Sequence, residues 1–179
     1  MADYKFVPIT KKKREKVPAS EQITQSTDLK TKYERGKECY YNGDYAGAVQ
    51  WYSKGAQNGE ADSINALGFC YYYGRGVPQS YAKAVEYYQK AANQGHAMAQ
   101  YNLGVYYERG NGVPQSYAKA VEYYQKAANQ GYAKAQYNLG VCYYNGDGVT
   151  KNLEKAKELL KKAAAQGHEG AKKALREHF

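Results

Sequence analysis

The chain has 179 residues, the length of one ordinary domain, and carries 26 Lys and Arg against 17 Asp and Glu, a formal net charge of +9. Its mean hydropathy is only -0.86 although 43% of the residues are hydrophobic, because 22 of them are tyrosines, whose rings pack while their hydroxyl groups seek water or a partner. No stretch approaches the ~18 apolar residues of a membrane-spanning helix, so we expect no membrane contact.

The N-terminal segment, residues 1–27, is rich in Pro, Thr, Ser and Gln around the basic run Lys11–Arg14. It has no apolar core of the kind a secretory signal needs, so we expect a cytoplasmic protein. The basic run is explained by a solvated, flexible tail, by a nuclear-import address or by an electrostatic contact with an acidic partner. We therefore divide the chain into a flexible basic tail, 1–27, and a repeat domain, 28–179.

The repeat domain has a period of 36 residues. The twenty residues from Gly76 to Gly95, GVPQSYAKAVEYYQKAANQG, recur unchanged from Gly112 to Gly131. The same step separates three leucines and four glycines: Leu67, Leu103 and Leu139, and Gly59, Gly95, Gly131 and Gly167. Self-similarity at a fixed step of this length is the signature of a repeat architecture.

Within each unit the spacing is helical. Ala99, Leu103 and Tyr107 step by four and predict a first helix, and the stretch from Ala118 to Ala127 predicts a second. The Gly and Pro residues between them end the first helix, and a serine caps the second. One such hairpin cannot bury its own apolar face, so neighbouring hairpins must stack into an all-α solenoid.

The pattern AxxxLGxxYYxGxGVxxxxxKAxxYYxKAAxQG resembles the Sel-one-like repeat, a relative of the tetratricopeptide repeat found in bacterial proteins. The copies that begin at Ala99 and Ala135 match closely, and the copy near Ala61 has Asn65-Ala66 in place of Tyr-Asn. The first copy, from about Lys30, has a shorter loop and looks like a plain tetratricopeptide unit. The resemblance implies a right-handed α-solenoid of about four stacked αα-hairpins, with a C-terminal capping helix between His168 and Phe179.

The family packing implies a close contact between the two helices of a hairpin. A glycine of the first helix should let it approach a small alanine of the second, in the pairs Gly68 with Ala84, Gly104 with Ala120 and Gly140 with Ala156. Tyr88 and Tyr124 should then fill the core between repeats. Cys70 and Cys142 occupy the repeat position of Tyr106, which favours packing over a disulfide.

Few residues suggest chemistry. Ser80 and Lys83, and Ser116 and Lys119, match the S-x-x-K pattern of penicillin-binding serine enzymes, but the S-D-N and K-T-G elements of those enzymes are missing from the sequence. Helix-capping serines explain both copies, so a hydrolase is a disfavoured alternative. No Cys/His pair has metal-ligand spacing. We therefore expect no catalytic residue, no cofactor and no metal site.

Binding is the function that the resemblance favours, with the first helices lining a concave groove that holds a protein or peptide segment. We expect an adaptor or scaffold that is monomeric and takes no small-molecule substrate, nucleic acid or membrane. The alternative is a secreted bacterial effector that acts on host proteins, with the basic tail as its address. Packing between repeats explains Tyr101 and Tyr137 equally well. The predicted groove residues are Asn65, Phe69, Tyr72, Tyr73, Tyr101, Asn102, Val105, Glu108, Arg109, Lys134, Tyr137, Asn138, Val141, Tyr144 and Asn145.

Overall fold

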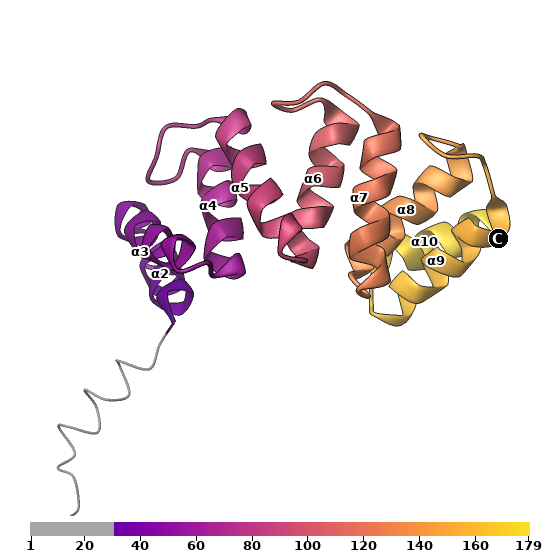
Figure 1. The fold of residues 1–179 in the computed structure, drawn as a ribbon. Helices are drawn as coiled ribbons and strands as arrows, with labels where there is room; N and C mark the ends of the chain where they lie inside the picture. The colour runs from indigo at the N-terminus through magenta and orange to yellow at the C-terminus, as the bar shows by residue number, and fades with distance from the viewer. Residues whose placement is uncertain (1–30) are drawn as a thin grey trace, which may run out of the picture. The chain divides into compact units, whose positions relative to one another are not determined.

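The computed structural model describes residues 31–179, and within them it shows nine α-helices and no strand (Figure 1). The predictions for the tail, 1–27, with its Lys11–Arg14 run, lie outside the described residues. None of the described helices is long and apolar enough to cross a bilayer. The helices are α2 (Lys32–Tyr41), α3 (Tyr45–Gln57), α4 (Ala61–Tyr73), α5 (Tyr81–Asn93), α6 (Ala97–Arg109), α7 (Tyr117–Asn129), α8 (Ala133–Asn145), α9 (Leu153–Ala165) and α10 (Glu169–His178).

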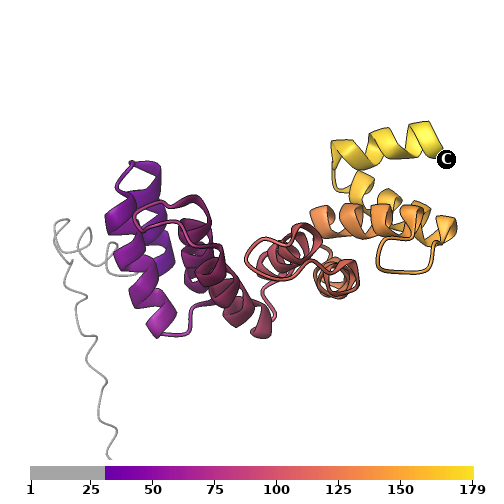
Figure 2. The same cartoon turned by 90° about the horizontal axis from the view of Figure 1, so that it is seen from above.

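The helices form hairpins that follow one another along residues 31–179 (Figures 1 and 2). The hairpins are α2–α3, α4–α5, α6–α7 and α8–α9, and α10 packs on α9. The second helix of each hairpin also contacts the first helix of the next one, so the hairpins stack, and α2 in addition contacts α4. The predicted all-α solenoid with a C-terminal capping helix is therefore confirmed.

The helix ends follow from the loop residues. The side chains of Ser80 and Ser116 accept a hydrogen bond from the backbone N–H three residues later, at 3.3 Å in both cases, and so cap α5 and α7. Gly74 and Gly110 end α4 and α6 with positive φ angles of 67° and 73°, a conformation that glycine adopts at no steric cost. The capping predicted from the sequence is confirmed.

The core between the repeats consists of leucine, alanine and tyrosine side chains. Leu103, Leu139 and Tyr124 are fully buried, and Tyr88 is 2% exposed. The prediction that Tyr88 and Tyr124 fill the core is confirmed. Burial disfavours the phenolate and raises the pKa of both tyrosines above the usual range, and at Tyr124 the carboxylate of Glu108 raises the pKa further.

The glycines of the first helices lie against a large side chain of the second helix. A Cβ atom on Gly104 would lie 2.5 Å from Cδ1 of Tyr124, and one on Gly68 would lie 2.8 Å from Cε1 of Tyr88. These glycines therefore make room for the tyrosine ring, which supplies their nearest atoms. At Gly140, Leu160 stands in place of the tyrosine. A Cβ atom on Gly140 would lie 3.4 Å from the backbone oxygen of Ala156, so at this glycine the alanine is among the nearest neighbours.

All three cysteines are free thiols. Cys70 and Cys142 are buried, and Cys39 is half-buried. Burial raises the pKa of the Cys70 thiol to about 11 and that of the Cys142 thiol to about 12. Protonated thiols in a packed interior behave as small apolar side chains, which agrees with the packing role predicted for them.

Candidate functional site

The first helices of the hairpins, α2, α4, α6 and α8, together with α10, form what we call the first-helix face. Two neighbouring cavities open on its N-terminal half. The α2–α4–α6 cavity has a volume of about 260 Å³, and the α4–α6 cavity has a volume of about 220 Å³. Phe69 and Asn102 line both cavities, so the two are adjacent, and together we call them the first-helix groove.

The first-helix groove brings together residues that lie far apart in the sequence. Within α4 and α6 it is lined by eight of the residues predicted for the binding site. These are Asn65, Phe69, Tyr72, Tyr73, Tyr101, Asn102, Val105 and Arg109. These eight predicted residues therefore lie together in the first-helix groove, and the other predicted residues lie outside it.

The other predicted residues make contacts within the fold. Glu108 accepts a hydrogen bond from the hydroxyl of Tyr124, and hydrogen bonding by Asn138 lowers the pKa of that same hydroxyl. Burial of the Tyr124 hydroxyl and its hydrogen bond to Glu108 raise its pKa by more than Asn138 lowers it, so the pKa of Tyr124 is raised overall. Glu108 and Asn138 are thus engaged in the core between repeats.

On α8 the predicted residues are half-covered by the C-terminal helix or turned to solvent. Tyr137 stacks on His168 with a distance of 4.5 Å between ring centroids, and Tyr144 contacts the rings of His178 and Phe179. For Tyr137, this contact shows the packing role that was weighed against binding. The remaining predicted positions are Val141, which is half-buried, and Lys134 and Asn145, which are exposed.

Several lining residues were missed by the sequence analysis. Tyr33, Lys37, Tyr40 and Tyr41 of α2 line the α2–α4–α6 cavity, and Met98 of α6 closes its other side. The α2 residues were missed because the first repeat departs from the common pattern. Its glycine, Gly36, lies 32 residues before Gly68, and the same step relates Tyr40 and Tyr41 to the predicted Tyr72 and Tyr73. This alignment would have found them.

At two lining positions of the α2–α4–α6 cavity, the second repeat carries smaller side chains than the third repeat does. In the third repeat the ring of Tyr101 packs 5.9 Å from that of Tyr124 and 5.3 Å from that of Tyr132. Asn65 and Ala66 stand where the third repeat has Tyr101 and Asn102. Asn65, which is smaller than the tyrosine of the third repeat, therefore lines the α2–α4–α6 cavity.

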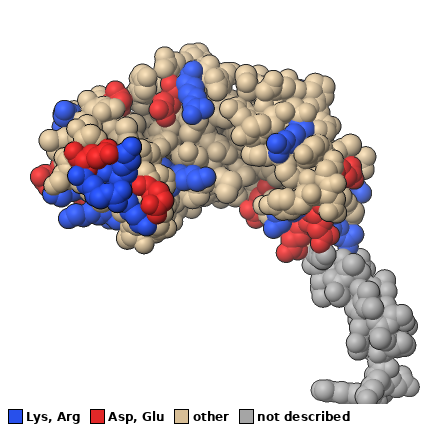
Figure 3. Space-filling view, turned by 180° about the vertical axis from the view of Figure 1, so that it is seen from behind, with Lys and Arg blue, Asp and Glu red and all other residues tan. Residues whose placement is uncertain are grey.

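The groove is lined by cationic side chains and by no carboxylate. Lys37 lines one cavity and Arg109 the other, and neither lining contains an Asp or Glu. Next to them the guanidinium of Arg75 lies between 5.2 and 5.9 Å from the rings of Tyr40, Tyr45, Phe69 and Tyr73. In the view of Figure 3 the charged side chains gather towards the two ends of the described unit, and the surface between them is mostly uncharged.

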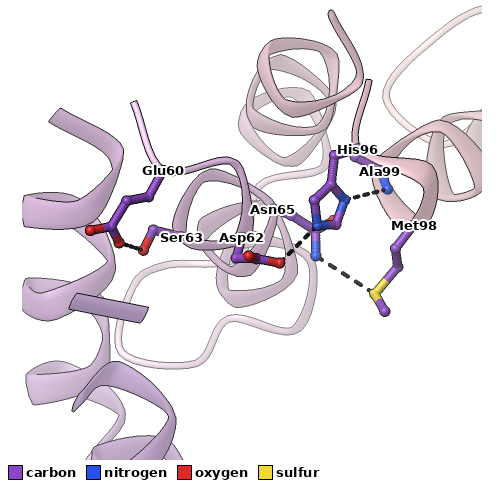
Figure 4. A network of polar contacts seen from close by, with 7 residues as sticks. All are labelled: Glu60, Asp62, Ser63, Asn65, His96, Met98 and Ala99. Atoms are coloured by element: carbon purple, nitrogen blue, oxygen red, sulfur yellow. Dashed lines mark hydrogen bonds and ion pairs between the residues drawn. The ribbon is translucent and has the colours of Figure 1, made fainter. Parts of the chain in front are cut away.

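The histidines have structural roles at helix ends. Nδ1 of His96 accepts a hydrogen bond from the backbone N–H of Ala99 at 3.2 Å, and its Nε2 lies 3.1 Å from Oδ1 of Asp62 (Figure 4). His168 caps α10 in the same way, through Ala171. His96 thus fixes the start of α6 against α4, beside the groove.

The S-x-x-K pairs are also explained by helix capping and packing. The hydroxyl of Ser116 caps α7, while the ammonium of Lys119 lies over the ring of Tyr107, 5.2 Å from its centroid. Ser80 and Lys83 repeat this arrangement, with Tyr71 as the ring. In both copies the serine and the lysine therefore each have a partner other than one another.

A separate cavity of about 500 Å³ lies among α7, α8 and α9. Several of the polar side chains that line it have partners within the fold. Gln136 donates to the backbone oxygen of Ala128 and accepts from Gln166, and Lys162 pairs with Glu158 at 2.5 Å. Although this cavity is larger, no large exposed apolar side chain lines it, so we place the candidate site in the first-helix groove.

The described helices match a family of known proteins. The Sel1 repeat model matches residues 32–60, 61–96, 97–132 and 133–168, which are the four helical hairpins. Comparison with curated proteins gave no match. Sel1 repeat proteins are generally non-catalytic modules that bind other proteins.

Among solved structures, the chain is similar to c5321, a protective antigen of uropathogenic Escherichia coli with an SLR fold, at 36% identity and a TM-score of 0.76. It is also similar to a Sel1 repeat protein from Oxalobacter formigenes, at 33% identity and a TM-score of 0.78. These matches cover 87% and 82% of this chain but only 35% and 58% of the relatives, so it spans a part of their length. From its four matched repeats, the chain belongs to the Sel1 repeat family.

Proposed function

We propose that the chain is a non-enzymatic adaptor or scaffold that holds a protein or peptide segment in the first-helix groove. The observation that carries this proposal is the exposure of large apolar side chains at the groove. Phe69 is 37% exposed, Met98 is 45% exposed and Tyr73 is 51% exposed, although all three lie on well-packed helices. Exposed apolar side chains that gather in one depression mark a binding surface.

The groove residues suit the recognition of protein. Tyrosine and phenylalanine offer rigid contact area and lose little conformational entropy on binding. The amide of Asn102, which lines both cavities, can donate to and accept from a peptide backbone. Because these side chains stand on stacked helices, the surface is already formed before a partner binds.

An affinity capture from the native cytosol tests the proposal. Wild-type chain is compared with Phe69→Ala/Asn102→Ala, and a partner identified by mass spectrometry is then purified and titrated against both. We expect the groove variant to lose the partner. The matched control is Gln125→Ala/Lys162→Ala in the cavity among α7, α8 and α9, which should retain it. Equal retention by both variants would place the binding site outside the groove.

A second candidate is that the protein acts outside the cytoplasm, as a secreted effector on host proteins. It is favoured by the similarity to the protective antigen of uropathogenic Escherichia coli. In this candidate the basic run Lys11–Arg14 directs the protein in the host cell. Expression of the chain with residues 1–20 deleted, fused to a fluorescent reporter in host cells, tests the idea. An unchanged location would refute it.

A further inference from the structure

Two buried polar atoms of the α2–α4–α6 cavity have no hydrogen-bond partner in residues 31–179, the hydroxyl of Tyr40 and Oδ1 of Asn65. Asn65 is only 9% exposed, and its Nδ2 faces the sulfur of Met98 at 3.7 Å (Figure 4). A thioether sulfur is a weak acceptor. Turning the amide over would only exchange the unpaired oxygen for an unpaired nitrogen. An unpaired buried polar group destabilises the free chain, so a ligand that pairs these atoms gains affinity.

The same cavity offers an apolar floor beside these polar atoms. Phe69, Met98 and Ala66 line it, and its volume of about 260 Å³ leaves room for one large side chain. The neighbouring α4–α6 cavity continues past Asn102 towards Arg109. An extended chain that buries a side chain at Asn65 can therefore run on along α6.

The charged side chains at the groove favour a ligand of one charge. Neither Lys37 nor Arg109 forms an ion pair with the described part of the chain, and Lys37 lies over the ring of Tyr33, 4.7 Å from its centroid. Glu108, the nearest carboxylate in the sequence to Arg109, is turned to Tyr124. The groove therefore presents two cations that no carboxylate neutralises, which favours an acidic partner.

We propose that the first-helix groove binds an extended acidic peptide segment with one large apolar side chain, which enters the α2–α4–α6 cavity. On binding, the side chains of Asn65 and Tyr40, whose polar atoms are closed off from solvent in the free chain, turn towards the segment; Oδ1 of Asn65 then accepts from a backbone N–H, and the hydroxyl of Tyr40 donates to a backbone carbonyl. Carboxylates on either side of the apolar residue face Lys37 and Arg109. This inference rests on the proposed function and adds the chemistry of the partner to it.

Selection of short random peptides, displayed on phage, against the full chain tests the inference. We expect the selected peptides to share one Leu, Ile, Met or Phe flanked by Asp and Glu. A fluorescein-labelled peptide of the enriched sequence is then titrated by fluorescence anisotropy. Arg109→Glu should weaken its binding by about tenfold or more, and raised salt should weaken binding to wild type. Lys134→Glu, an equal charge change on α8 outside the groove, should leave it unchanged.

Asn65→Tyr is the matched test of the cavity, because it restores the residue type of the third repeat and fills the space. It should abolish binding while its thermal melt stays cooperative. Selected peptides that are basic or uncharged but depend on Asn65 would overturn the acidic assignment and leave the proposed function standing. Peptides that bind Asn65→Tyr and Arg109→Glu with the same affinity as wild type would overturn both the acidic assignment and the proposed function. A failed selection, with a protein partner still lost by Phe69→Ala/Asn102→Ala, would overturn the extended-peptide inference alone.

Discussion

The ring of Tyr124 lies directly against the backbone of Gly104, so closely that a Cβ on the glycine would be 2.5 Å from Cδ1 of the ring. In the last repeat the equivalent pair is Gly140 and Leu160, and there the nearest atom, Cγ of the leucine, is 3.2 Å away. One repeat position thus tolerates a side chain far less in one hairpin than in the next.

This difference predicts that a glycine-to-alanine substitution destabilises the protein at position 104 but not at position 140. Gly104→Ala should lower the free energy of unfolding by about 1–3 kcal/mol, because the methyl group collides with a fully buried ring. Gly140→Ala should be neutral or stabilising, since alanine is favoured over glycine in a helix by about 1 kcal/mol. Urea unfolding followed by circular dichroism measures both.

A double variant checks the cause. Gly104→Ala/Tyr124→Leu reproduces the side-chain size of the last repeat, so it should be less destabilised than the sum of its two single variants. Additive losses would show that the ring of Tyr124 is not what excludes a side chain at position 104.

The cavity among α7, α8 and α9 also predicts a stabilising substitution. Tyr107 and Tyr123 stack with ring centroids 5.6 Å apart, and the hydroxyl of Tyr123 donates to Oε1 of Gln89 at 2.8 Å. Leu159 stands where Tyr123 does and lines the cavity beside Tyr143. Leu159→Tyr should restore the stack and raise the free energy of unfolding by about 1 kcal/mol. Tyr123→Leu is the reverse control, and an unchanged melting temperature for Leu159→Tyr would contradict the idea.

Burial of tyrosines predicts loss of stability at alkaline pH. Desolvation raises the pKa of Tyr52, Tyr88, Tyr106 and Tyr124 above the usual value for tyrosine, about 10. The folded state therefore keeps these groups protonated while the unfolded state ionises them. Their contribution is fully present below about pH 10 and is lost as the pH rises above it, by about 1.4 kcal/mol per pH unit and tyrosine. Thermal melts across this range measure the slope.

Tyr124→Phe separates the tyrosines from other groups that titrate in the same range. The variant has one fewer phenol to ionise on unfolding, so its stability should fall less steeply with pH than that of wild type. Parallel slopes for the two proteins would argue against ionisation of Tyr124 as a cause.

The thiols predict a simple labelling pattern. Burial raises the pKa of Cys70 to about 11 and that of Cys142 to about 12, so the reactive thiolate is scarce near neutral pH. Brief treatment of the native protein with iodoacetamide should label the half-buried Cys39 first, as read by peptide mass spectrometry. In denaturant all three should react alike, and rapid labelling of native Cys142 would contradict its burial.

Much of the fold could be predicted from the sequence because its determinants are local. The helical spacing around Leu103, the capping serines and the glycines that end the helices act within a few residues of each other. The step of 36 residues then shows that the hairpins are equivalent and must stack. The exchange of Asn65-Ala66 for Tyr-Asn was visible in the sequence too, but its consequence was not.

The candidate site was only partly predictable, because it depends on contacts between repeats. Eight predicted residues line the groove, yet Glu108 is turned to Tyr124, and Tyr144 is covered by His178 and Phe179. Residues from α2 join Asn65 only after the hairpins stack. The sequence by itself determined the helices, their ends and their repetition, since these follow from short-range spacing. Only the tertiary structure decided where the surface stays open, because a cavity depends on the sizes of side chains that three successive first helices bring together.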